Sequence, residues 1–308
     1  MTDLFSTMGD NLDLGYMNLR AGETKDERIL ADTLQVMWDR YEPYADPDFA
    51  PGFARDPEGR FWEMFLGCAL MDAGKTLLPT AERPRETGHP DLCVVDGKRR
   101  IWIEAITPDR GKPGEDRIPE IVPLNEGGGV QRQPVRQIQL RITSALWNKS
   151  QIIRCYLKRG VVAEHDICLI AIGAARFGIY AQGPGFPLAL FAVFPIGDEF
   201  VRVDRDKLKR GFLSSGTIKR ISNDDIPRTA FMDTEFSHVS GLIWSRVSIG
   251  NMSRKVRPLS FIHNPLCSNE MPQRWGVWDR EFVTTRDGDA WTTSDILSEP
   301  ESDLGTGV

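Results

Sequence analysis

The order of hydrophobic patterns between residues 60 and 175 constrains the fold more than any other feature of this sequence. The run RFWEMFLGCALMDAGK is apolar almost all round, which predicts a buried helix. LCVVDGKRRIWIEAI predicts two strands joined at Asp96-Gly97, a dipeptide that favours a tight hairpin. A long amphipathic helix follows over 134–160, and ICLIAIGAA then predicts a strand buried on both faces. This order predicts an α/β domain in which helices flank a mixed central sheet.

The segments on either side extend this core. Residues 26–41 carry apolar side chains at helical spacing, so residues 1–57 are expected to form an arm whose helix packs on the core. The apolar runs LALFAVFPIG, SGLIWSRVSI and PLSFIHNP predict further strands, which places one α/β domain over 58–285. Residues 286–308 are expected to be an acidic, disordered tail.

Charge is unevenly distributed along the chain. Six acids and no Lys or Arg lie between Asp287 and the last residue, and they account for the whole net charge of −6, so the other 286 residues are neutral. Within that neutral part, 201–220 holds seven basic and two acidic residues, and 240–260 holds four basic and no acidic residues. Such patches are compatible with a nucleic-acid partner, although charge runs are more often ordinary solvated surface.

Several classes of protein are excluded by absent patterns. The five cysteines are odd in number and widely spaced, without a C-x-x-C pair, which argues against a disulfide scaffold and suits a reduced cytoplasm. The four histidines show no H-E-x-x-H spacing, so a zinc hydrolase is not expected. No run of about 18 apolar residues exists, and the first residues lack a basic start before an apolar run. We therefore expect a cytoplasmic protein without a membrane partner.

Glu63 is the first candidate for chemistry, because it is the only charged residue between 61 and 71. A carboxylate on a buried helix is costly unless it is paired or faces a site. An arginine partner and a functional site both remain open for Glu63 at this point.

Asp91 and Glu104 form the second candidate. Asp91 precedes the first strand of the hairpin and Glu104 lies near the end of the second, so both belong to the open end of the ribbon. Two acids at one end of a β-ribbon repel each other unless a cation lies between them. The alternative is an ordinary solvated strand end.

Lys149 is the third candidate, because it interrupts the apolar stripe of the long helix. It follows Ala145 by four positions and precedes Ile153 by four, so it occupies a core-facing position. An inward lysine favours an anion nearby. The alternative is that its long stem carries the ammonium to the edge of the core.

Together these residues resemble the core motif of the PD-(D/E)XK nuclease superfamily. The run Gly88-His89-Pro90-Asp91, then LCVV, the hairpin and IWIEAI match that motif's Pro-Asp, spacer across a β-turn and acid on the second strand. The helix before the hairpin, which carries Glu63, also matches. The resemblance covers roughly 58–175, and it extends to uncharacterised bacterial proteins with a similar "RFWEM…WIEA…Lys" layout.

The resemblance implies a restriction-endonuclease-like αβββαβ core with an N-terminal helical arm and extra C-terminal strands. It implies that Asp91, Glu104 and the carbonyl of Ala105 or Ile106 hold one or two Mg²⁺ (or Mn²⁺) ions, with Glu63 as a further ligand. The implied activity is hydrolysis of phosphodiester bonds in DNA, in defence against foreign DNA. Cleavage of both strands of a duplex would favour a homodimer.

One position departs from the motif. The superfamily has a lysine two positions after the second acid, where this chain has Ile106. Some members take that lysine from the following helix, and Lys149 is the candidate for this role, orienting a water or stabilising the transition state. Gln137 and Gln139 on the same helix are weaker candidates for contacts to the phosphate or to a metal-bound water.

Two alternatives follow from this departure. The first is a catalytically inactive member that uses the same fold to bind nucleic acid or protein. The second is a small-molecule enzyme whose acidic cluster binds a metal for another substrate.

Overall fold

The computed structural model describes residues 2–84, 88–122, 126, 128–129, 132–181, 186–204, 207–252, 259–287 and 290–298. Its helices are α1 (Leu14–Ala21), α2 (Lys25–Tyr41), α3 (Phe49–Arg55), α4 (Pro57–Asp72), α5 (Val135–Lys158) and α6 (Leu190–Val193), with 3-10 helices η1 (Glu42–Tyr44), η2 (Thr80–Glu82), η4 (Ala175–Ala181), η5 (Ala230–Met232), η6 (Thr234–Phe236) and η7 (Ile249–Asn251). Its strands are β1 (Thr76–Leu77), β2 (Leu92–Asp96), β3 (Arg99–Ile106), β4 (Ile167–Gly173), β5 (Ile196–Asp204), β6 (Lys207–Ser214), β7 (Thr217–Lys219), β8 (Asp225–Pro227), β9 (Gly241–Ser245), β10 (Leu259–His263), β11 (Arg280–Asp287) and β12 (Ala290–Asp295).

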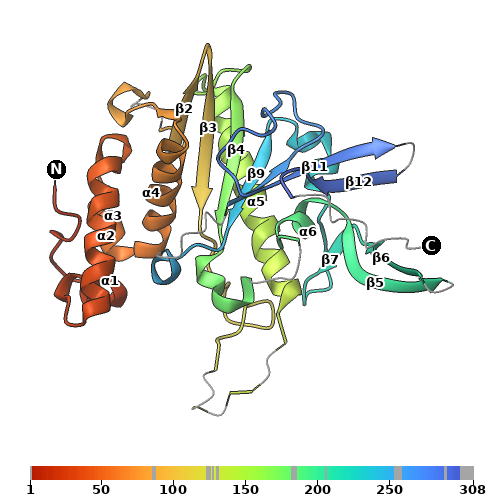
Figure 1. The fold of residues 1–308 in the computed structure, drawn as a ribbon, viewed down its shortest axis with the longest axis horizontal. Helices are drawn as coiled ribbons and strands as arrows, with labels where there is room; N and C mark the ends of the chain where they lie inside the picture. The colour runs from red at the N-terminus through yellow and green to blue at the C-terminus, as the bar shows by residue number, and fades with distance from the viewer. Residues whose placement is uncertain are drawn as a thin grey trace.

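A mixed eight-stranded sheet runs through the molecule in the order β1-β2-β3-β4-β9-β10-β11-β12. The pairs β3–β4, β4–β9 and β10–β11 are parallel, and the remaining pairs are antiparallel. Helices α1 to α4 gather at one end of the molecule, and the β5–β6 hairpin projects at the other (Figure 1). The fold is therefore α/β with a large mixed sheet and helices.

Side chains that alternate along the hairpin divide the core between two helices. Ile101 and Ile103 of β3 pack in the hydrophobic cluster that contains the apolar residues of α4. Trp102, which points the other way, packs in the cluster that contains the apolar stripe of α5. Helices α4 and α5 therefore cover opposite faces of the sheet, and this arrangement brings residues far apart in sequence to the same strand.

The predicted helices and hairpin are confirmed. Residues 26–41, the apolar run after residue 60 and the segment 134–160 correspond to α2, α4 and α5. The hairpin turns at Asp96-Gly97, where Gly97 adopts a φ of 63°, a conformation that favours glycine. The strands expected over 167–175, 240–249 and 258–265 are β4, β9 and β10 of one sheet.

Two local predictions are wrong. LALFAVFPIG was expected to be a strand, but its first part forms the one-turn helix α6, and β5 begins only at Ile196. A short apolar run flanked by prolines is equally compatible with a buried helical turn, because periodicity cannot separate the two. The predicted disordered tail starts too early, since residues 290–295 form β12 against β11; residues 299–308 lie outside the described residues.

A buried arginine completes the sheet edge beside the hairpin. Strand β1 pairs with Val94 and Val95 of β2, and the N–H of Leu78, which follows β1, donates to the Cys93 carbonyl at 2.8 Å. Beyond it, the buried Arg83 guanidinium donates to the carbonyl of Asp91 at 2.8 Å and to the carbonyl of Leu78 at 3.0 Å. A third donation reaches the carbonyl of Tyr44 at 3.1 Å and ties this edge to η1. Arg83 thereby fixes the backbone that carries Asp91.

Within the described residues, none of the helices combines the length and apolarity that crossing a membrane requires.

Candidate active site

Asp91 and Glu104 lie opposite each other where the hairpin opens. The register of β2 and β3 pairs Leu92 with Ile103, so one further position places Asp91 opposite Glu104. The Ala105 N–H donates to Asp91 Oδ2 at 2.6 Å, which confirms this placement. Because directly opposite residues of an antiparallel pair share a face, the two acids lie on the α5 side of the sheet.

Lys149 reaches this pair from α5. Its Nζ donates to Glu104 Oε1 at 2.6 Å, and both side chains are largely buried, with 15% and 6% of their surface exposed. The second oxygen of Glu104, Oε2, is buried without a hydrogen-bond partner. The inward position predicted for Lys149 is confirmed, and the contact leaves one carboxylate oxygen of Glu104 unsatisfied.

Glu63 joins the cluster from the opposite helix, and the arginine partner considered for it is present together with a tyrosine. Tyr41 donates its hydroxyl to Glu63 Oε1 at 2.7 Å, and Arg60 donates to Oε2 at 3.1 Å. Only 5% of Glu63 is exposed. The charge of Asp91 also acts on Glu63, so the acids of α4 and of the hairpin belong to one electrostatic group.

Burial raises the pKa of all three acids. Desolvation, followed by the charge of Asp91, raises the pKa of Glu104 to about 8 and that of Glu63 to about 8. Desolvation also raises the pKa of Asp91, although the charge of Lys149 and the Ala105 N–H oppose that rise. The metal-free cluster therefore retains protons near neutral pH, which is the behaviour of carboxylates that lack enough positive charge nearby.

Lys149 behaves differently from these acids. Desolvation would lower the pKa of its ammonium, but the charges of Glu104 and Asp91 outweigh it, so the pKa is raised. Lys149 is therefore a cation over the whole physiological range. It can donate hydrogen bonds and compensate negative charge, but it cannot accept a proton as a general base.

A second layer of polar residues surrounds the cluster. Asp46 lies close enough to raise the pKa of Asp91 and Glu104 further. His89 is 3.7 Å from Asp46 through its Nε2 atom. Tyr156 donates its hydroxyl to the His89 carbonyl at 3.2 Å, and desolvation and the charge of Glu104 raise its pKa. His89, in the loop before β2, therefore contacts both Tyr156 of α5 and Asp46, which follows η1.

The donor set suits a hard divalent cation held by two carboxylates. Mg²⁺ is usually bound through one or two carboxylates, with waters and substrate phosphates completing its coordination. Asp91 and Glu104 lie opposite each other, and Glu104 Oε2 is buried and unsatisfied. Across the described ranges, no group of three or more His, Cys, Asp or Glu residues is arranged to hold a metal. Both oxygens of Glu63 already accept hydrogen bonds, so its role as a third metal ligand stays a prediction. The role of the Ala105 carbonyl as a ligand also stays a prediction.

The glutamines of α5 do not reach the cluster. Gln137 donates to the carbonyl of Glu115 at 3.2 Å, and Gln139 accepts from Arg228 at 3.0 Å. They precede Lys149 by 12 and 10 positions, which corresponds to roughly 15–18 Å along a helix. The suggested contact of these glutamines with a bound phosphate at this site is wrong in the structure described here.

The cluster also contains residues that sequence reasoning missed. Arg60 precedes Glu63 by three positions on the same helix, a spacing that brings two side chains together and could have identified it. Tyr41 and Asp46 come from other segments, and no local pattern connects them to the hairpin. The basic segments 201–220 and 240–260 lie partly outside the described residues.

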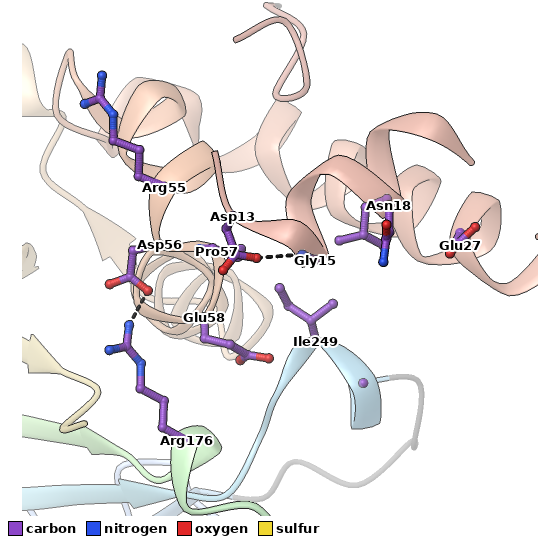
Figure 2. Close-up of a pocket in the computed structure, with 12 residues that line it drawn as sticks. Asp13, Gly15, Asn18, Glu27, Arg55, Asp56, Pro57, Glu58, Arg176 and Ile249 are labelled. Carbon is purple, nitrogen blue, oxygen red and sulfur yellow. Dashed lines mark hydrogen bonds and ion pairs between the residues drawn. The ribbon is translucent and has the colours of Figure 1, made fainter. Parts of the chain in front are cut away.

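A cavity of about 730 Å³ lies at the N-terminal end of α4, and none of the acids of the cluster lines it. Figure 2 shows the residues that line this cavity. Arg176 pairs with Asp56, the residue that caps α4. Glu58 accepts from the backbone of Ile249, and desolvation raises its pKa to about 7, while its Oε2 is buried without a partner. Glu58 precedes Glu63 by five positions and so lies on another side of α4.

Comparisons with protein families, with curated proteins and with solved structures found no match to this chain.

Proposed function

We propose that the chain is a metal-dependent nuclease that hydrolyses phosphodiester bonds in DNA. The observation that carries the proposal is the 2.6 Å contact between Lys149 and Glu104, next to Asp91. This contact brings an amine next to Asp91 and Glu104, although the motif's usual lysine position, two residues after Glu104, is Ile106 in this chain. The element order α4-β1-β2-β3-α5-β4 also supports the proposal, because the resemblance implies an αβββαβ core.

The roles of the residues follow from their contacts. Asp91 is oriented by the Ala105 N–H, and Glu104 presents an unsatisfied oxygen on the same face. Lys149 remains protonated and has three N–H donors, so it can donate both to Glu104 and to a phosphate oxygen or an attacking water. The chemistry that Mg²⁺ or Mn²⁺ supplies when bound is activation of a water and compensation of negative charge on the phosphate.

Glu63 has a supporting role in this scheme. Arg60 and Tyr41 fix its carboxylate beside Asp91, and its raised pKa lets it hold a proton near neutral pH. The choice of DNA, the role in defence and the homodimer come from the resemblance and the expected cleavage of both strands.

A second function, that of an inactive nucleic-acid- or protein-binding module, is favoured by the burial of the cluster. Glu63 and Glu104 are each only 5% exposed. A substrate phosphate would therefore have to displace the residues that bury Glu104 before it could reach this carboxylate.

Cleavage assays on the purified chain separate these functions. Plasmid and labelled oligonucleotides are incubated with and without Mg²⁺ or Mn²⁺, using the parent chain and the variants Asp91→Asn, Glu104→Gln and Lys149→Met. Lys158→Ala, an exposed position on the same helix, is the matched control. The proposal predicts metal-dependent cleavage by the parent and the control, and none by the three site variants.

Other results assign the chain differently. Salt-dependent DNA binding without cleavage by the parent identifies the binding module. If the parent chain neither binds nor cleaves DNA, the remaining candidate is the small-molecule enzyme, whose acidic cluster would serve another substrate.

A further inference from the structure

A basic cavity of about 810 Å³ lies at the N-terminal end of α5, away from the acidic cluster. Its basic lining residues are Arg132, Arg136, Lys219 and Arg228, and its single acid is Asp198. The cavity has a size suited to a small organic ligand. Its charge favours an anion.

Arg228 is the unusual member of this lining. It is 6% exposed, and its guanidinium donates to the Ser215 carbonyl at 2.6 Å and to Gln139 Oε1 at 3.0 Å. Both acceptors are neutral, and no carboxylate of the described residues lies within 4.0 Å to form an ion pair. Asp198 acts on this charge from beyond ion-pair distance, but desolvation outweighs it and lowers the pKa of Arg228. A closer anion in the cavity would compensate this buried charge, so the arrangement favours an anionic ligand.

The start of α5 adds to this preference. The helix is 24 residues long, no side chain caps its N-terminal end, and its first turn has no acid. The positive end of the helix dipole therefore lies at the cavity, and no acid of the helix's own first turn compensates it, although Asp116 pairs with Arg136 of that turn. Lys219 of β7 lines the same cavity.

The other wall is aromatic. Phe212 of β6 packs edge-on against Phe186 and Phe191, with ring centroids 5.6 Å and 5.9 Å apart, and all three rings line the cavity. Phe212 retains 37% exposure. Flat apolar surfaces of this kind accept nucleobases, and base–aromatic stacking contributes about 1–3 kcal/mol per base.

We propose that this cavity is a nucleotide-binding site, in which Arg228 and the start of α5 bind the phosphate and the three phenylalanines contact the base. The site goes beyond the proposed nuclease function, because it uses none of the acidic cluster. Lys149 is 14 positions further along α5 than Val135, which corresponds to about 21 Å of helix. The nucleotide can be a free mononucleotide or one unit of a bound strand, since both present the same phosphate and base.

Calorimetric titration of the full chain tests the proposal, with inorganic phosphate, AMP and a short single-stranded DNA as probes. Arg228→Gln removes the buried charge, and Phe212→Ala removes part of the aromatic wall at an exposed position. Lys219→Ala provides a second test of charge that does not disturb the core. Lys25→Ala, on α2, is the control for loss of one positive charge.

The expected result is that AMP binds more tightly than phosphate and that Arg228→Gln or Lys219→Ala weakens both at least tenfold. Phe212→Ala should weaken AMP but not phosphate, and Lys25→Ala should leave binding unchanged. Binding of DNA but not AMP, with the same variant pattern, identifies the strand as the source of the nucleotide. The absence of binding by all three probes, or equal binding by the parent and the cavity variants, overturns the proposal whatever the cleavage assays give.

Discussion

The ammonium of Lys149 lies 2.6 Å from the carboxylate of Glu104, although 45 positions separate the two residues. The contact forms because β3 presents Glu104 on the face that α5 covers, and because Lys149 takes the place of an apolar residue in the buried stripe of that helix. A cation that replaces a core residue beside two acids is the feature from which the following predictions derive.

Replacing Lys149 with methionine keeps its stem and removes its charge. Glu104 would then be buried without a counterion, and removing one partner of a buried ion pair costs about 3–5 kcal/mol. We expect a smaller loss than this at low pH, because Glu104 can take up a proton, and a growing loss as the pH rises through about 8. Urea unfolding of the parent and variant at several pH values measures the difference. A loss that does not change with pH would contradict the pairing.

Cleavage should respond to the same substitution. Removing one well-placed donor to a developing negative charge typically lowers kcat by about 10²–10³. We therefore expect Lys149→Met to lose at least about a hundredfold in metal-dependent cleavage. Retained cleavage by a folded Lys149→Met chain would exclude this lysine from the reaction.

The stability of the metal-free chain should fall at alkaline pH. The folded-state pKa values of Glu63 and Glu104 are raised to about 8 from the ordinary value of 4.5 for a glutamate side chain. A raised pKa gives a stability contribution that is complete below the unfolded value and is lost as the pH rises through the folded value. Thermal unfolding in a chelator should therefore show Tm decreasing between about pH 6 and 9.

Glu63→Gln is the matched test of that slope, because it keeps the shape and removes the titrating group. Because the carboxyl titrates near 4.5 when unfolded and near 8 when folded, the substitution should remove a penalty that is already present at pH 6 and is clearly larger at pH 9. Glu82→Gln, a substitution on η2 outside the cluster, should leave the slope unchanged. An equal effect of Glu63→Gln at both pH values would show that proton binding at Glu63 is not its cause.

Mg²⁺ should counteract the alkaline loss of stability. A cation that binds only the folded chain stabilises it by about 2.7 kcal/mol at a hundred times its Kd. Because it competes with the protons of Asp91 and Glu104, the rise in Tm on adding Mg²⁺ should be larger at alkaline than at acidic pH. Asp91→Asn should abolish the rise, and NaCl at equal ionic strength controls for screening. A rise of the same size in Asp91→Asn would place the ion elsewhere.

Tyr41→Phe tests the contribution of the second helix to the cluster. The change leaves Glu63 Oε1 buried without its donor, which costs about 1–3 kcal/mol. The half-buried Tyr44, which follows closely on the chain, provides Tyr44→Phe as the control. Denaturant unfolding near neutral pH compares the two variants, and a similar loss in both would mean that the Glu63 contact does not contribute.

The sequence predicted the parts of the site that depend on short-range patterns. Asp96-Gly97 determined the hairpin and hence placed Asp91 opposite Glu104, while the spacing of Ala145, Lys149 and Ile153 indicated that the lysine points inward. Tyr41 and Asp46 were missed because their approach depends on how α2 and its connector pack, which no local period encodes. The short helix α6 was missed because an apolar run bounded by prolines has no distinguishing period.

The bonds of Arg83 have a consequence for how the chain behaves in concentrated solution. By donating to the carbonyls of Leu78 and Asp91, this side chain occupies a position that a neighbouring strand would otherwise fill. An uncovered strand edge is a template for pairing with a second molecule. Truncation of Arg83 should therefore cause concentration-dependent aggregation that the parent chain does not show, so that this guanidinium protects the protein's solubility as well as its shape.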